Sequence, residues 1–234
     1  MAKLKYKRVS LKLSGEAMGG GDVLDFDAIA DIAAKISALN KLGVQVGITC
    51  GGGNIIRGGR SGKALERNRA DHMGMLATTI NSLALCDALE KLDVPCAVLS
   101  SVDMPRFCDT FSARLANAEL SAGKVVIFAA GSGSPFVTTD TAAALRAAEI
   151  GADAMLLAKN IDAVYSADPR LDENATRYTE LTYNDVIKNE LKATDLTAIM
   201  LCRENSIPIL VFAMNGEDNL IKAVRGENVG TLIH

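Results

Sequence analysis

The segment that decides the fold is KVVIFAAGSGSPFVTTDTAAALRAAEI, residues 124–150. It opens with an almost uninterrupted apolar run, 124–130, which is typical of a strand buried on both faces of a parallel sheet. A glycine-rich turn at 131–134 follows, and residues 139–150 then have the apolar spacing of a helix. A buried strand, a glycine turn and a helix in this order predict the repeating unit of an α/β protein.

The same alternation extends outward over the rest of the chain. We expect strands at 6–13, 44–49, 96–100, 124–130, 154–158 and 208–212. We expect helices at 25–42, 73–92, 111–122, 139–150, 184–191, 195–205 and 218–224. This order predicts a mainly parallel sheet covered by helices on both faces. A polar, turn-rich segment at 159–182 interrupts it and is interpreted as a lid or half-site. We find no internal repeat or linker, so residues 1–234 are expected to form a single domain.

Composition limits the function classes. The chain has 234 residues, 49% of them apolar, and a net charge of −3, which argues against nucleic-acid binding. Its five cysteines include no Cys-x-x-Cys pair, so reduced thiols of a cytosolic protein are expected. The N-terminal basic residues precede no apolar stretch of the kind found in signal peptides. The longest apolar run, 207–214, is far too short to cross a bilayer. We therefore expect a soluble, cytoplasmic protein without a membrane partner.

Three predicted strands end in glycine turns, at 14–15, 51–54 and 131–134. Glycines let backbone N–H groups approach phosphate oxygens, and ligands of open α/β sheets bind where strands end. The Walker and Rossmann spacings are both broken, which excludes a P-loop enzyme and an ordinary dinucleotide binder. With only His72 and His234 available, and no Gly-x-Ser-x-Gly, hydrolase and zinc-enzyme chemistry fit poorly. The turns favour a phosphate or nucleotide site.

Two cations lie beside these turns. Lys12 is a lone cation near the end of an apolar strand, where it can neutralise a transferring phosphoryl group. Arg57 follows the triple glycine closely enough to bind a phosphate, which arginine does bidentately. For Lys12 the alternative stays open that a strand-end lysine is merely solvent-exposed.

Four aspartates are ambiguous. Asp71 and Asp140 stand where a helix is expected to begin, so each is either a ligand or an N-cap. Asp162 and Asp168 lie in the turn-rich segment, where aspartate is common as a turn residue.

Longer motifs carry a resemblance to a known family. They are KLSGEA at 12–17, GGGNIIRG at 51–58, DHMGMLAT at 71–78, GSGSPFVTTD at 131–140, DAVYSADP at 162–169 and LKATDL at 191–196. With these motifs the chain, from about residue 7 to 233, resembles the bacterial uridylate kinases of the amino acid kinase family. The segment 71–78 is specific to that branch, whereas the glycine motifs are shared across the family.

The resemblance implies a three-layer αβα fold and a homo-oligomer, expected to be a hexamer. It implies transfer of the ATP γ-phosphate to UMP, giving UDP and ADP for pyrimidine nucleotide (CTP) biosynthesis. Mg²⁺ would accompany ATP without a metal cage of protein ligands, and UTP is an expected feedback inhibitor. The turn at 19–25 departs from the family pattern, which leaves activation by GTP open.

Matched position by position, the resemblance assigns site residues in three groups. The catalytic positions are Lys12, Arg57 and Asp195. The ATP positions are Lys12, Leu13, Ser14, Gly15, Gly53, Arg57, Asn160, Tyr165 and Asp168, with Lys159 an alternative to Asn160. The UMP positions are Gly52, Asp71, Ser132, Gly133, Ser134, Pro135, Phe136, Val137, Thr138 and Thr139.

Two alternatives remain open at this point. One is a kinase of the same family that acts on carbamate, glutamate or aspartate, against which 71–78 and 132–139 argue. The other is a non-catalytic storage protein on the same fold, against which Lys12, Arg57, Asp140 and Asp195 argue. A panel of acceptor substrates separates the kinases, and release of ADP on adding UMP distinguishes a UMP-specific kinase from a storage protein.

Overall fold

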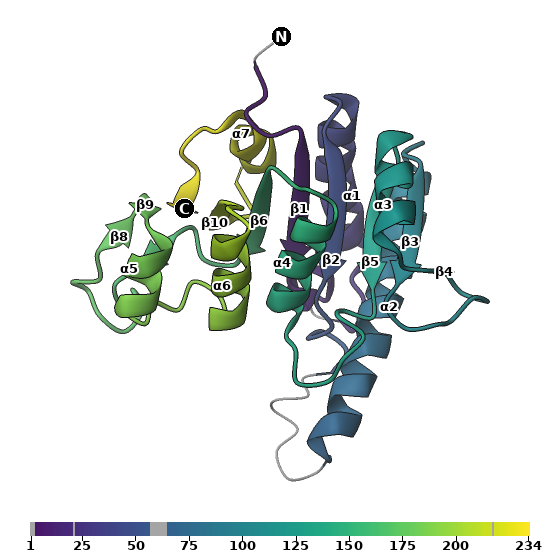
Figure 1. Cartoon of the computed structure of the whole chain (residues 1–234), viewed down its shortest axis with the longest axis horizontal. Helices are drawn as coiled ribbons and strands as arrows, with labels where there is room; N and C mark the ends of the chain where they lie inside the picture. The colour runs from purple at the N-terminus through teal and green to yellow at the C-terminus, as the bar shows by residue number, and fades with distance from the viewer. Residues whose placement is uncertain (1–2, 21, 57–64, 217) are drawn as a thin grey trace.

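The computed structural model describes residues 3–20, 22–56, 65–216 and 218–234, and these residues form a nine-stranded sheet (Figure 1). Its order is β4-β3-β5-β2-β1-β6-β10-β11-β9. The strands are β1 (Arg8–Leu13), β2 (Gln45–Cys50), β3 (Cys96–Ser100), β4 (Asp109–Thr110), β5 (Val125–Ala129), β6 (Ala154–Lys159), β9 (Glu180–Leu181), β10 (Ile209–Ala213) and β11 (Gly230–Ile233). All pairings are parallel except that of β10 with β11.

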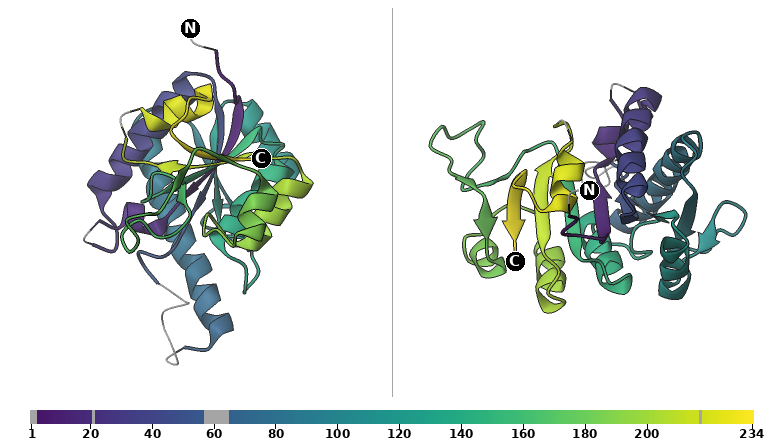
Figure 2. Two further views of the ribbon diagram at one scale, coloured as in Figure 1. Left: turned by 90° about the vertical axis from the view of Figure 1, so that its left-hand side faces the viewer. Right: turned by 90° about the horizontal axis from the view of Figure 1, so that it is seen from above.

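Helices cover both faces of this sheet, as Figure 2 shows. One face carries α1 (Phe26–Lys41), α2 (Arg67–Glu90) and α7 (Asn219–Arg225), which pack on the side chains of Val9, Leu11 and Leu13. The opposite face carries α3 (Ala113–Ser121), α4 (Thr139–Glu149), α5 (Tyr183–Lys188) and α6 (Leu196–Glu204), which pack on Phe128 and Leu157. The prediction of a mainly parallel sheet between two helical layers is confirmed.

Strand β1 occupies the middle of the sheet and fixes where a site can form. Lys12 is paired in register with Thr49 of β2 and with Leu157 of β6. Because the neighbouring strands are parallel, the turns after β1, β2, β5 and β6 meet at one edge of the sheet. All the glycine turns noted in the sequence therefore lie on the same side.

The start of α2 was wrongly predicted at residue 73. The helix begins at Arg67, and Glu66 is its N-cap, accepting hydrogen bonds from the backbone N–H groups of Asn68 and Arg69. The first turns are polar because they face solvent, so they carry no apolar periodicity for a sequence pattern to detect. Asp71 thus lies inside the helix, and its interpretation as an N-cap is wrong.

The same correction applies to α4. Its N-cap is Thr138, whose hydroxyl accepts from the backbone N–H of Thr141, so Asp140 lies in the first turn and is no cap.

The turn-rich segment 159–182 contains short strands that the sequence pattern did not predict. Two of them, β7 (Val164–Tyr165) and β8 (Arg177–Tyr178), pair with each other in a separate antiparallel sheet. Strands β4, β9 and β11 were also missed, because runs of two to four residues carry too little periodicity. A short 3-10 helix, η1 (Gly15–Met18), follows β1.

Two further expectations can be compared with the described residues. All five cysteines, which lie in the described part, are free thiols. None of the helices described is long and apolar enough to span a membrane.

Candidate active site

The first two glycine turns pack backbone to backbone at the carboxyl edge. The N–H of Gly51 donates to the carbonyl of Leu13 at 2.8 Å. A Cβ added to Gly15 would lie 2.5 Å from the Gly53 nitrogen and 3.0 Å from the Gly51 oxygen, which no side chain can accept. Glycine is required here because two loops must approach each other closely.

A buried amide on α2 holds the second turn, and the sequence analysis missed it. Asn81 donates from Nδ2 to the carbonyl of Gly51 at 2.7 Å and to the Asn54 Oδ1 at 2.8 Å. Asn81 is fully buried, so these hydrogen bonds compensate its desolvation. Asn54 of the motif at 51–58 therefore has a structural role, since it binds Asn81, and a motif match alone does not reveal this role.

Lys12 lies against a carboxylate of α4. Its Nζ is 2.8 Å from Asp140 Oδ1, and Lys159 Nζ is 3.5 Å from Asp140 Oδ2. The Thr194 hydroxyl donates to the same carboxylate at 2.7 Å. Two ammonium groups, from the ends of β1 and β6, thus converge on one carboxylate beside the glycine turns.

The two lysines keep the carboxylate of this cluster ionised. Burial disfavours the Asp140 carboxylate, but the charges of Lys12 and Lys159 outweigh it and lower the pKa of Asp140 to about 2. Burial is also the main reason that the pKa of Lys159 lies below its ordinary value, with Asp140 opposing the shift. Two lysines thus lie beside a single ionised carboxylate, an arrangement that suits a phosphoryl group.

Asp195 occupies a different place. It caps α6, accepting from the Ala198 N–H at 2.9 Å, and accepts from the hydroxyls of Thr141 at 2.6 Å and Thr138. The carboxylate in contact with Lys12 is Asp140, whereas Asp195 ties the start of α4 to α6. Asp140 was given in the sequence analysis only as a ligand or a cap, because its lysine partners are distant in sequence.

A small cavity of about 140 Å³ lies between α2 and the third glycine turn. It is lined by Gly52, Gly53, Ile56, Ala70, Asp71, Gly74, Met75, Thr78, Gly131, Ser132, Ser134, Val137 and Thr139. Six of the ten positions that the resemblance assigns to UMP are among them. Gly74, Met75 and Thr78 come from the motif at 71–78, in which only Asp71 had been singled out.

Asp71 closes this cavity on one side. Its Oδ2 accepts the backbone N–H of Phe136 at 2.8 Å, and both oxygens accept from Arg67 Nε at 2.9 and 3.0 Å. Burial opposes ionisation, but these hydrogen bonds and the Arg67 charge lower the pKa of Asp71. Among the other UMP positions, Phe136 exposes 66% of its surface and Thr138 donates to Asp195.

On the other side of Lys12 lie two larger cavities of about 640 and 630 Å³ that share Ile161, Pro169 and Arg170. The first is lined by Tyr165, Asp168 and the segment 190–193. The second is lined by Lys12, Ser14, Lys159 and Asn160, so both candidates at 159–160 face it. We call the two together the donor cavity. Arg57, assigned to both ATP and catalysis, lies outside the described residues.

Two polar groups at the donor cavity differ in how they are satisfied. The buried Ser14 hydroxyl has no hydrogen-bond partner among the described residues. Asp168, in contrast, forms an exposed ion pair with Arg170 at 2.7 Å, and hydrogen bonds from Arg170 lower its pKa to about 2. The unpaired hydroxyl is available to a ligand oxygen, whereas Asp168 already has a partner.

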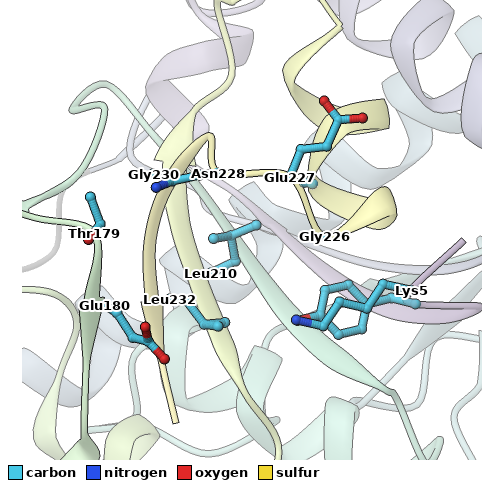
Figure 3. A pocket seen from close by; sticks show the side chains of 11 residues that line it. Lys5, Thr179, Glu180, Leu210, Gly226, Glu227, Asn228, Gly230 and Leu232 are labelled. Atoms are coloured by element: carbon cyan, nitrogen blue, oxygen red, sulfur yellow. The ribbon is translucent and has the colours of Figure 1, made fainter.

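A separate cavity of about 180 Å³ lies away from this cluster and is shown in Figure 3. Its lining includes Lys5 and Tyr6, which precede β1, together with Glu180, Glu227 and Leu232. It therefore opens near the amino end of β1, opposite the edge where the glycine turns meet.

The family model for the amino acid kinase family matches residues 7–213, and the chain belongs to that family. The resemblance found in the sequence is thereby confirmed. Among solved structures, the chain is similar to the UMP kinase from Bacillus anthracis, with 36% identity over 98% of this chain and 96% of the other and a TM-score of 0.95. The UMP kinase from Ureaplasma parvum is 38% identical over 98% and 99%, with a TM-score of 0.92. The uridylate kinase from Archaeoglobus fulgidus is 28% identical over 97% and 100%, with a TM-score of 0.75.

Proposed function

We propose that this chain is a nucleoside monophosphate kinase that transfers the γ-phosphate of ATP to UMP, giving UDP and ADP for pyrimidine nucleotide biosynthesis. The observation that carries the proposal is the position of the Lys12–Asp140–Lys159 cluster between a small cavity and a large one. Lys12 lines the donor cavity, and its partner Asp140 directly follows Thr139 of the small cavity. A group transferred between the two cavities would therefore lie close to this cluster.

The small cavity suits the acceptor. It is formed largely by the segments 71–78 and 131–139, and the UMP kinases of B. anthracis and U. parvum are similar to this chain over nearly its whole length. The ionised Asp71 can accept hydrogen bonds from ribose hydroxyls, and the turn at 131–134 offers backbone N–H groups to a phosphate. We therefore assign UMP to the small cavity and ATP to the donor cavity.

Phosphoryl transfer needs positioning and charge neutralisation more than covalent chemistry by the protein. Lys12 and Lys159 would stabilise the negative charge on the transferring group, and Asp140 holds their ammonium groups in place. The Ser14 hydroxyl and the N–H groups of the turn at 14–15 would bind phosphate oxygens of ATP. Arg57 is proposed to contribute a further positive charge.

Mg²⁺ is proposed to enter with ATP. Within the described residues, no three His, Cys, Asp or Glu side chains gather closely enough to hold a metal ion. This suits an ion coordinated mainly by nucleotide phosphates and water, with Asp162 and Glu16 nearby in the lining of the donor cavity. Bound in that way, the ion would neutralise charge on the β- and γ-phosphates.

A coupled assay of ADP release tests the function. We expect turnover with UMP and Mg-ATP to exceed that with CMP, dUMP, carbamate, glutamate or aspartate at least tenfold. Turnover highest with an amino acid or carbamate would instead support another member of the family. No turnover with any acceptor would support a storage or binding protein. UTP added to the same assay tests the proposed feedback inhibition.

We also propose that the chain acts as a homo-oligomer, expected to be a hexamer. Met73, Leu76, Ile80 and Leu83 follow one another at helical spacing on α2 and are each at least 38% exposed, which forms an apolar stripe. The amino-terminal half of α2 extends beyond the sheet (Figure 1), so another copy can reach it. Burial of this stripe against a second copy would remove its apolar surface from water.

Light scattering of the purified protein measures the oligomer. We expect a mass above that of one chain and a smaller mass for the variant Leu76→Glu with Ile80→Glu. Phe107→Glu, a matched change at an exposed apolar residue in the loop after β3, should leave the mass unchanged. A monomeric wild-type protein would refute the proposal.

The free thiols suit a reducing compartment, and we place the enzyme in the cytoplasm.

A further inference from the structure

Arg146 of α4 is a buried cation outside the cluster at Lys12. Only 3% of its surface is exposed, and its guanidinium lies 3.7 Å from the centroid of the Phe111 ring and 5.9 Å from that of Phe128. It pairs with Glu149, and its Nε has no hydrogen-bond partner among the described residues. Burying a guanidinium is costly, so an arginine is rarely kept in such a place for packing alone.

Arg146 is connected to the acceptor turn through one hydroxyl. Its Nη2 donates to the Ser101 Oγ at 2.7 Å, and the Ser101 Oγ donates to the carbonyl of Gly131 at 2.8 Å. A guanidinium has only donors, so the serine oxygen must accept from Arg146. The single hydroxyl proton of Ser101 is therefore directed to Gly131. The charge of Arg146 also polarises the hydroxyl and strengthens this second hydrogen bond.

The turn that receives this hydrogen bond has an unfavourable backbone. Ala130, Gly131 and Gly133 have φ values of 60°, 58° and 79°. The left-handed conformation costs about 1 kcal/mol at a residue such as Ala130, so the surroundings must stabilise it. Gly133 lies so close to Ser101 that an added Cβ would be 2.9 Å from the Ser101 carbonyl oxygen. Ser101 thus lies against the turn at two points, Gly131 and Gly133.

We propose that Arg146 and Ser101 are positioning residues that hold the turn 131–134 in the shape that binds the acceptor phosphate. The proposal rests on the assignment of the small cavity to the acceptor. Asp71 fixes the far end of the same loop through the N–H of Phe136, so the loop is held at both ends. Neither Arg146 nor Ser101 lines the cavity, and each acts through the Gly131 carbonyl.

Steady-state kinetics of Ser101→Ala test this inference. We expect the KM for UMP to rise about five- to twentyfold, while the KM for ATP changes less than twofold. Arg146→Met should have a similar effect, and the double variant should add little, because the two residues act in series. Arg146→Lys, which keeps the charge and one donor, should recover part of the affinity for UMP.

Tyr183→Phe is a matched control, because it removes another buried hydroxyl that donates to a backbone carbonyl, that of Ile207. It should lower the melting temperature without changing either KM. If Ser101→Ala behaves like Tyr183→Phe, the two residues are merely structural and the inference is wrong.

Amide hydrogen exchange provides a readout that does not depend on catalysis. In Ser101→Ala, exchange should accelerate in 131–136 and remain unchanged in β10 and β11. Unchanged exchange in 131–136 would overturn the inference even if the wild-type protein phosphorylates UMP. The wild-type protein could also prove inactive on UMP while Ser101→Ala still exchanges faster in 131–136. That result would refute the proposed function but support the hydrogen bonds that run from Arg146 through Ser101 to Gly131. Should Arg146→Met fail to fold, Ser101→Ala decides alone.

Discussion

The acceptor and donor sides of the site are built in opposite ways. The acceptor cavity has a volume of about 140 Å³ and lies between a helix and a turn held by Asp71 and Ser101. The donor side offers cavities of about 640 and 630 Å³, lined in large part by 161–172. There the ion pair of Asp168 with Arg170 is exposed to solvent.

This contrast suggests that selectivity and charge neutralisation reside in different places. A preorganised, narrow acceptor site discriminates among small substrates because a misplaced group leaves buried donors and acceptors unpaired. The larger donor site can bind ATP mainly through contacts to its phosphates at one end, near Lys12 and Ser14. Substitutions on the acceptor side should therefore change the KM for UMP, and those between the sides should change kcat.

Lys12→Ala should have the largest effect, because Lys12 lies between the two sides. We expect kcat to fall at least about a hundredfold, the effect of losing one preorganised charge-stabilising donor, with a smaller change in nucleotide binding. Lys124→Ala is the control, since it removes a lysine from a surface ion pair with Glu119 away from the glycine turns. Near-normal kcat in purified Lys12→Ala would eliminate its role in charge stabilisation.

Asp140→Asn should have the next largest effect and should also destabilise the fold. The pKa of Asp140 is about 2, below its ordinary 3.8, so its ionisation stabilises the folded state above pH 4. That contribution is lost as pH falls through about 2. The shift corresponds to about 2 kcal/mol at neutral pH, and the amide also leaves two lysines without their counter-charge.

Denaturant unfolding and kinetics together check this change. We expect Asp140→Asn to lower the free energy of unfolding by about 2 kcal/mol at pH 7, with a smaller difference from wild type near pH 3. We also expect kcat to fall at least tenfold, because the ammonium groups are no longer held together. Equal stability of the two proteins at pH 7 would contradict the pairing.

Much of the fold could be predicted from sequence because its signals are local. Strands β5 and β6 are apolar runs, and glycine turns follow three strands, so their meeting at one edge follows from parallel order alone. The pairing of Lys12 with Asp140 and the contact of Arg146 with Ser101 could not be predicted in this way. Each joins residues on different elements, and only the packing of α4 on the sheet brings them together. The start of α2 was missed because its first turns are polar.

Asp71→Asn should weaken the binding of the acceptor, UMP, and leave the binding of ATP almost unchanged. We expect the KM for UMP to rise about tenfold, while the KM for ATP changes less than twofold, because the amide accepts fewer hydrogen bonds than the ionised carboxylate. Stability is not the explanation, since Glu66 and not Asp71 caps α2. Glu66→Gln is therefore the control, expected to lower stability slightly with unchanged kinetics, because the amide loses one of the two oxygens that cap the helix. Equal effects of Asp71→Asn on both KM values would remove the distinction between the two sides.

Asp168→Asn should have the smallest effect, and it tests the donor half of the comparison. Asp168 lines the donor cavity, but its exposed ion pair with Arg170 adds little to stability, because solvent and salt screen such pairs. If the donor side binds ATP mainly at the phosphate end, the KM for ATP should rise no more than about threefold, with kcat and the KM for UMP unchanged. Asp172→Asn, which alters a neighbouring carboxylate of the same lining, provides the baseline for a charge removed nearby. A rise of tenfold or more in the KM for ATP with Asp168→Asn alone would mean that Asp168 recognises the nucleoside directly, and that the donor side is as specifically built as the acceptor side.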